Sequence, residues 1–184
     1  IMPSLVGSEM CIRDRDRIQK AMVVCSNRKI AYALLQKFKD KYPEWFEEKK
    51  SPDGVSVTEE KLKELKPMPF MAMVSSVGSN DEKDMYDYLG GVKNDKRSEE
   101  LDAAFKQEKS NFSIVIVVDM WITGFDVPCL TYLYNDKPLK KHLLIQTISR
   151  VNRKYPGKEY GMVIDYIGIR DNMRAVSYTH LRAH

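Results

Sequence analysis

The chain has 184 residues, enough for one domain with a buried core, and its 30 basic and 26 acidic side chains give a net charge of +4. This small excess neither requires nor excludes a polyanionic partner. The longest apolar run, Ile114–Val118, is too short to span a bilayer, so we expect no membrane partner. Three cysteines without paired spacing argue against a disulfide scaffold and a zinc ribbon, and they favour a cytoplasmic location.

The two ends of the sequence do not read as parts of a fold. Val6–Asp14 back-translates to a DNA string whose reverse complement encodes Val176–His184, over nine consecutive codons. The string also resembles a transposon-derived sequencing adapter. We therefore predict that residues 1–15 and 175–184 are adapter-derived, non-native tails, and that residues 16–174 form one domain, an internal piece of a longer protein.

Segments typical of strands and helices alternate along residues 16–174. The first strand, Ala21–Cys25, precedes a helix that runs to about Lys41, with apolar residues at helical spacing. Residues 43–68 are rich in charge and proline, and we expect a solvated insertion with a short helix at Glu59–Leu65.

The rest of the chain continues the alternation. Further strands are expected at Phe70–Ser75, Ile114–Val118, Thr131–Tyr134 and Met162–Tyr166, and further helices at Asp81–Leu89, from the cap residue Ser98 onward, and at Lys140–Arg153. This order predicts an α/β fold with a parallel sheet and right-handed crossovers.

One candidate site lies in VDMWITGFDVP, between Val118 and Pro128. This segment leaves the most apolar strand at its carboxyl end, the edge at which α/β sheets bind ligands. Gly124 lets the backbone approach a ligand closely, and Asp126 can accept hydrogen bonds from sugar hydroxyls. The alternative is that Asp126 only caps a turn.

A second candidate site lies in QTISRVNR. Gln146, Arg150 and Arg153 fall at i, i+4 and i+7, on one stripe of the expected helix. Two arginines on one anchored face suit bidentate recognition of phosphate oxygens, and the alternative is a surface face paired with acidic side chains. A second stripe is apolar and is expected to face the core; it comprises Leu144, Ile148 and Val151.

Together the two segments resemble motifs V and VI of superfamily 2 helicases, above all those of the restriction (R) subunit of type I restriction–modification enzymes. AMVVCSNRKIAYALL resembles that family's motif IV region, and GMVIDYIGI resembles its continuation. The resemblance covers residues 16–174 except the insertion at 43–68, although Ser149 stands where many superfamily 2 proteins have glycine. It implies a RecA-like parallel β-sheet with helices on both faces, the second such domain of an ATP-dependent DNA translocase.

The resemblance also implies roles for individual residues. Arg150 and Arg153 would supply arginine-finger charge to ATP, which is bound with Mg mainly by the first RecA-like domain. On the nucleotide side, Asp126 would approach the ribose, Gly124 would let the backbone come close to the nucleotide, and Gln146 would help couple the nucleotide to domain closure. Contacts to DNA phosphates are expected from Ser26, Asn27, Arg28, Ser75, Ser76 and Thr123.

Other features limit what this piece can do alone. The sequence contains no GxxxxGK[ST] phosphate loop, no acidic magnesium-binding motif and no metal-ligand cluster, so we expect the fragment alone to neither hydrolyse ATP nor cut DNA. The implied parent is an ATP-dependent type I deoxyribonuclease whose partners are double-stranded DNA and the methyltransferase and specificity subunits. The alternatives are another superfamily 2 helicase and a non-catalytic α/β module that binds nucleic acid or protein.

Overall fold

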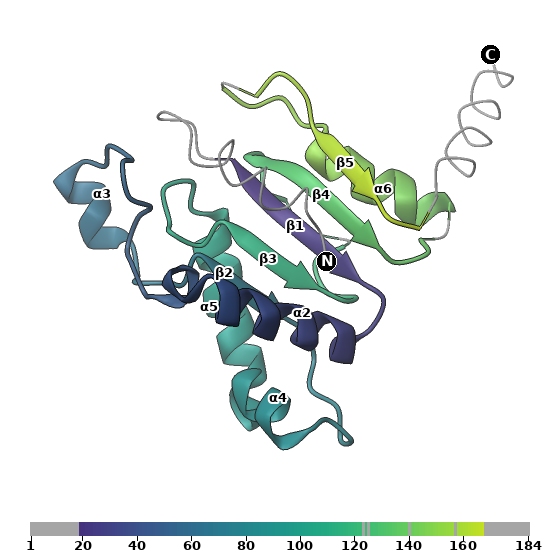
Figure 1. Ribbon diagram of the computed structural model, residues 1–184. Coiled ribbons are helices and arrows are strands. Elements are labelled where there is room, and N and C mark those ends of the chain that lie inside the picture. The colour runs from purple at the N-terminus through teal and green to yellow at the C-terminus, as the bar shows by residue number, and fades with distance from the viewer. Residues whose placement is uncertain (1–18, 123, 125, 140, 157, 168–184) are drawn as a thin grey trace, which may run out of the picture.

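The computed structural model describes residues 19–122, 124, 126–139, 141–156 and 158–167, so both predicted tails lie outside the described residues. Five parallel strands form one sheet in the order β2-β3-β1-β4-β5 (Figure 1). The strands are β1 (Lys20–Cys25), β2 (Met71–Val74), β3 (Ile114–Val117), β4 (Leu130–Asp136) and β5 (Met162–Asp165). The α-helices are α2 (Arg28–Lys41), α3 (Glu59–Glu64), α4 (Lys83–Tyr88), α5 (Asn94–Lys106) and α6 (Lys141–Val151), with 3₁₀ helices η1 (Pro43–Phe46) and η2 (Gly91–Lys93).

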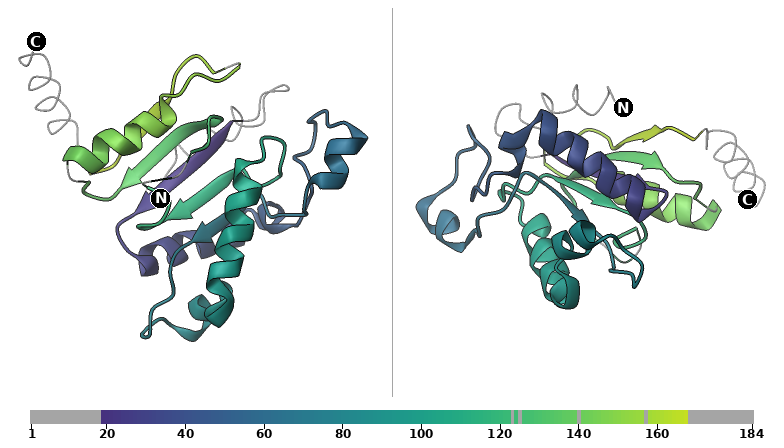
Figure 2. Two further views of the ribbon diagram at one scale, coloured as in Figure 1. Left: turned by 180° about the vertical axis from the view of Figure 1, so that it is seen from behind. Right: turned by 60° about the horizontal axis from the view of Figure 1, so that its bottom comes forward.

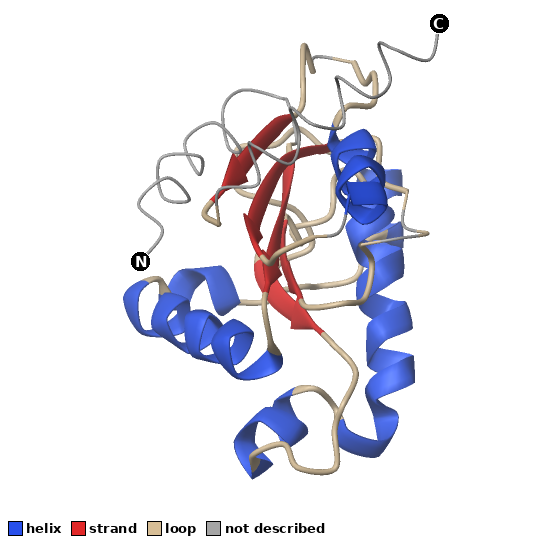
Figure 3. Cartoon of the chain, turned by 90° about the vertical axis from the view of Figure 1, so that its right-hand side faces the viewer, coloured by secondary structure: helices blue, strands red, loops and turns tan. Residues whose placement is uncertain are grey.

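Helices cover both faces of the sheet. Seen edge-on, α2 and η1 lie on one face and α5 and α6 on the other (Figures 2 and 3). Because successive strand side chains point to opposite faces, Val23 of β1 packs beneath α2, whereas Met22 and Val24 pack on the side of α5. The predicted α/β fold, a parallel sheet between two helical layers, is confirmed.

Two predicted helices differ in their ends. The helix expected from Ser98 begins at Asn94, and Ser98 lies inside it as a buried residue. Asn94 stabilises this earlier start, since its Nδ2 donates to the carbonyl oxygens of Ser75 at 3.0 Å and Leu89 at 2.8 Å. The last helix, expected to reach Arg153, ends at Val151.

The insertion at 43–68 is solvated in its middle and packed at its ends. The short helix predicted there forms as α3, which buries no residue. Trp45, in contrast, is fully buried, and its ring stacks on Tyr42 with centroids 4.7 Å apart. A backbone bridge between Lys49 and Met68 closes the insertion at its base. Aromatic burial at Trp45, together with this backbone bridge, therefore joins the two ends of the segment to the rest of the domain.

Candidate functional site

Asp126 and Arg153 meet on the surface of the domain, although 27 residues separate them in the sequence. Arg153 Nη1 donates to Asp126 Oδ2 at 2.5 Å, and each side chain is 47% exposed. An exposed ion pair contributes only about 0–1 kcal/mol, so a ligand can exchange with either partner at little cost. The structure thus brings together two of the predicted site residues in an accessible place.

Two buried valines hold this pair in position. Val127 directly follows Asp126, and Val151 precedes Arg153 by two residues; both belong to the apolar core on the α5 side of the sheet. Because each charged residue lies within two residues of an anchored one, the separation of the two charges is fixed mainly by core packing.

Two residues between α6 and β5, Lys158 and Gly161, pack against the elements that carry this ion pair. Lys158 Nζ donates to the carbonyl oxygens of Leu130 at 2.6 Å and Pro128 at 3.2 Å, and burial lowers the pKa of Lys158. A β-carbon at Gly161 would lie 2.0 Å from the carbonyl oxygen of Val151. The chain can therefore pass this close to the last turn of α6 only with glycine at position 161.

The sequence placed Asp126 at the carboxyl edge of the sheet, and the structure places it near the opposite edge. After β3, Asp119 remains at the carboxyl edge, where Lys137 contacts it. The chain then crosses the sheet and has reached the start of β4 by Asp126. A parallel neighbour must begin at the opposite edge from the one at which the previous strand ends, and α6 returns Arg153 to that same side.

The crossing segment, which connects β3 to β4, has a backbone feature that the sequence did not reveal. Trp121 has a φ of 65°, in the left-handed region that aromatic residues rarely adopt. Its ring lies 5.9 Å from that of Phe105, and the neighbouring Ile122 is buried. Packing against α5 therefore holds this part of the segment in an uncommon conformation.

The other residues predicted to face a nucleotide are placed as follows. Gln146 is exposed on α6, and Gly124 is exposed in the crossing segment. Arg150 is half-buried, and its buried Nε has no hydrogen-bond partner among the described residues. The apolar stripe packs as predicted, since Leu144 and Val151 are buried and Ile148 is partly buried. Arg153 lies beyond the helix end, so it does not share the stripe of Gln146 and Arg150.

The carboxyl edge gathers five of the residues predicted to contact DNA, while Thr123 lies outside the described residues. Ser26 Oγ donates to the carbonyl oxygen of Asp136 at 2.5 Å, and Asn27 Oδ1 caps α2 by accepting the amide hydrogen of Ile30 at 3.0 Å. Ser75 is buried, so the structure removes it from direct contact with a ligand. The five residues, from the ends of β1 and β2, are Ser26, Asn27, Arg28, Ser75 and Ser76.

Arg28 points into the loop that follows β2. Its Nη2 lies 2.9 Å from Asp81 Oδ1, and the Asp81 side chain is only 4% exposed. Asp81 Oδ2 accepts the amide hydrogen of Gly78 at 2.6 Å, and Arg28 Nη1 donates to the carbonyl oxygen of Ser76 at 3.4 Å. The guanidinium therefore already has partners within the protein.

Sequence reasoning missed three charged residues that shape these regions: Asp81, Lys158 and Lys20. Lys20 is fully buried, its Nζ donates to the carbonyl oxygens of Phe105 and Gln107 at 2.7 and 2.8 Å, and burial lowers its pKa to about 8. A lone lysine at the head of an apolar strand is a signal that could have found it. Asp81 and Lys158 give no local signal, because their partners are distant in the sequence.

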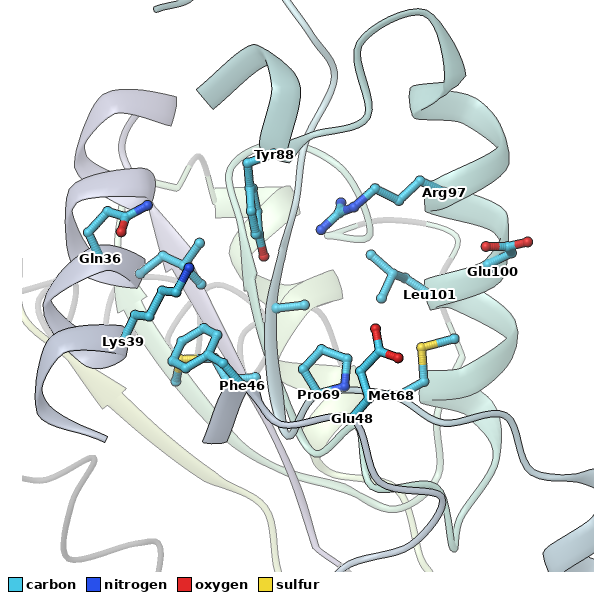
Figure 4. Close-up of a pocket in the computed structure, with 13 residues that line it drawn as sticks. Gln36, Lys39, Phe46, Glu48, Met68, Pro69, Tyr88, Arg97, Glu100 and Leu101 are labelled. Carbon is cyan, nitrogen blue, oxygen red and sulfur yellow. The ribbon is translucent and has the colours of Figure 1, made fainter. Parts of the chain in front are cut away.

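A groove of about 360 Å³ lies away from all these residues, between α2 and α5 along the edge strand β2 (Figure 4). Its rim carries two cations and two carboxylates, from Lys39, Arg97, Glu48 and Glu100. The edge strand is already engaged here, since Met73 N–H donates to Tyr88 Oη at 3.1 Å and Arg97 Nη1 donates to the Met73 carbonyl oxygen at 3.1 Å. None of the predicted site residues lines this groove.

The described part of the chain contains no helix long and apolar enough to cross a membrane. It also contains no group of three or more histidine, cysteine or acidic side chains that could hold a metal ion.

Comparison with known proteins decides the family. The family described as "Type I restriction enzyme subunit R domain 3" matches residues 17–168. The chain belongs to this family. It is 40% identical over 154 residues to the MjaIXP type I restriction enzyme endonuclease subunit of Methanocaldococcus jannaschii, covering 84% of this chain and 12% of that protein. It is 32% identical over 161 residues to the HindI type I restriction enzyme endonuclease subunit of Haemophilus influenzae, covering 86% of this chain and 14% of that protein.

A solved structure has a fold similar to that of this type I restriction domain. That structure is a fragment of an HsdR subunit of a type I restriction enzyme from Vibrio vulnificus, with a TM-score of 0.54 and 16% identity over 90% of this chain and 26% of that one. At this identity the likeness concerns the fold alone. The chain thus spans about one eighth of the length of these two endonuclease subunits, and its family is one domain of the R subunit.

Proposed function

We propose that this chain is the second RecA-like domain of the ATP-dependent DNA translocase in a type I restriction endonuclease subunit. It closes on ATP through Arg150 and Arg153, and its carboxyl edge contacts duplex DNA. The observation that carries the proposal is the exposed Asp126–Arg153 pair, which joins the ends of two motif-bearing segments on one accessible surface.

The side chains at this surface suit a nucleotide. A guanidinium matches the geometry of phosphate oxygens, and a carboxylate accepts hydrogen bonds from sugar hydroxyls. ATP, bound with Mg, would supply the phosphoryl group whose transfer to water releases the free energy for translocation. The sequence offers no acidic magnesium motif, so we assign the metal to another domain of the subunit.

The two arginines have different tasks in this proposal. Arg153, which Asp126 holds at the surface, exchanges its carboxylate partner for phosphate oxygens. Arg150, whose Nε is buried and lacks a partner in the described region, adds a second, less mobile positive charge. Positive charge that is fixed where negative charge develops accelerates phosphoryl transfer by about 10³–10⁵ in enzymes that use an arginine finger.

The test uses the whole endonuclease subunit that carries this domain. Arg153→Ala and Arg150→Ala should each lower the kcat of DNA-stimulated ATP hydrolysis. For Arg153, which binds the phosphate oxygens in this proposal, the loss should be about 10³-fold or more. Lys154→Ala is the matched control, because it removes an exposed positive charge beside Arg153. Unchanged hydrolysis in both arginine variants would favour a non-catalytic module that binds nucleic acid or protein.

The partners follow from the same proposal. The endonuclease subunit would assemble in the cytoplasm with methyltransferase and specificity subunits, the latter choosing the DNA site. Co-purification of the three subunits, followed by ATP-dependent cleavage of unmethylated DNA, tests this part separately from the arginine variants.

A further inference from the structure

We propose that Arg28 is a positioning residue for DNA binding. Its guanidinium holds the loop between β2 and α4, residues 75–82, and the loop itself meets the phosphate backbone. This inference rests on the proposed function, because it assumes that the carboxyl edge of the sheet contacts duplex DNA.

Arg28 already makes contacts within the protein. Its guanidinium is 2.9 Å from the Asp81 carboxylate and donates to the Ser76 carbonyl oxygen at 3.4 Å. The Asp81 side chain is 4% exposed, whereas that of Arg28 is 32% exposed. A buried carboxylate without a partner is costly, so Arg28 cannot move to a phosphate without leaving Asp81 uncompensated.

Arg28 also packs tightly against Gly78 of the loop. A β-carbon at Gly78 would lie 2.2 Å from Arg28 Nη2, so the guanidinium fills the space beside this glycine. The Gly78 amide also donates to the other oxygen of Asp81, at 2.6 Å. Arg28, Asp81 and Gly78 therefore form one clamp, which fixes the turn of the loop.

The clamp leaves part of the loop accessible. The start of the loop is fixed by Asn94, whose buried Nδ2 donates to the Ser75 carbonyl oxygen at 3.0 Å. Between these two anchors, the exposed residues are Ser76, Ser79 and Asn80. Small polar side chains and backbone amides of this kind contact phosphates without regard to base sequence.

The clamp and a direct phosphate contact predict opposite effects of removing Asp81. If Arg28 bound phosphate, Asp81 would compete with DNA for it, so Asp81→Asn would raise DNA affinity. If Arg28 positions the loop, Asp81→Asn loosens the loop and lowers affinity, although it also removes a negative charge near DNA. A directly bound arginine further contributes about 0.9 to the slope of log affinity against log salt, and a positioning residue does not.

The experiment measures binding of the endonuclease subunit to a fluorescent non-specific duplex between about 50 and 200 mM salt. We expect Asp81→Asn to weaken binding by about tenfold at every salt concentration, with an unchanged slope. We expect Gly78→Ala to do the same, because a β-carbon displaces the guanidinium while every charge is kept. That displaced group is the end of a flexible side chain, so the variant should still fold, which circular dichroism verifies.

A control and three results decide the matter. Lys37→Ala, which removes an exposed charge from the middle of α2, calibrates the effect of one lost charge. Tighter binding or a steeper slope in Asp81→Asn would overturn the inference and leave the proposed function intact. Unchanged affinity in both clamp variants would also overturn it, since the clamp would then be structural only. Absence of DNA binding by the unmodified subunit would overturn the proposed function, and this inference with it.

Discussion

Two arginine–aspartate ion pairs in this domain have the same chemistry and different surroundings. Asp81 of the Arg28 pair is 4% exposed and also accepts a backbone amide, whereas both members of the Arg153–Asp126 pair are 47% exposed. The first pair cannot open without leaving a buried charge, and the second can open at little cost. Burial of the carboxylate therefore separates an arginine that shapes the protein from one that is available to a ligand.

The largest expected effect comes from a substitution in the exposed Arg153–Asp126 pair, which we call the open pair. Arg153→Lys keeps the positive charge and loses the planar fork that binds two phosphate oxygens. In the endonuclease subunit, we expect kcat for DNA-stimulated ATP hydrolysis to fall by about 10²-fold, the cost of one missing transition-state donor. An increase in KM alone, with kcat retained, would mean that Arg153 binds the nucleotide but does not act on the reacting phosphate.

The next effect is on stability, and it compares the two glycines that pack beside the ion pairs, Gly161 and Gly78. Gly161→Ala places a β-carbon against the backbone of Val151, whereas Gly78→Ala places one against a flexible guanidinium. We expect Gly161→Ala to destabilise the domain by about 1–3 kcal/mol and Gly78→Ala by less. Thermal unfolding of the two variants measures the difference. Equal losses would contradict the view that the support of the open pair is the more rigid one.

A smaller effect is expected when the carboxylates themselves are removed and the free energies of unfolding are compared. Asp81→Ala removes a buried carboxylate that accepts one backbone hydrogen bond and pairs with Arg28, and it should cost about 2 kcal/mol, while Asp126→Ala should cost less than about 0.5 kcal/mol. Urea unfolding curves give both values. An equal cost for the two substitutions would remove the distinction drawn from burial.

A further effect, on the pH dependence of stability, concerns Lys20, the first residue of β1. Burial lowers its folded-state pKa from 10.5 to about 8, so between these pH values the unfolded chain binds more protons. The stability contributed by Lys20 should therefore rise as pH increases from about 8 to 10.5. Subtracting the unfolding free energy of Lys20→Met from that of the unmodified protein isolates this rise from the thiols and tyrosines. A flat difference would contradict the burial of the amine.

The sequence predicted the strands and their alternation with helices because the apolar runs are short, β-branched and separated by clear caps. Leu144 and Val151 show that it also predicted which face of the last helix is buried. It misplaced Asp126, since a loop pattern does not tell how far the chain travels across a sheet before the next strand begins. It also could not show that Arg28 is paired, because Asp81 lies on a different element.

The edge strand β2 shows how the sheet ends. Tyr88 and Arg97 occupy the outward N–H and C=O of Met73, the groups through which another chain would add a strand. Two side chains thus replace the missing neighbour at this position. A consequence for handling the protein is that strand addition at Met73 must first displace both side chains, which disfavours cross-β assembly through this side of the molecule in concentrated samples.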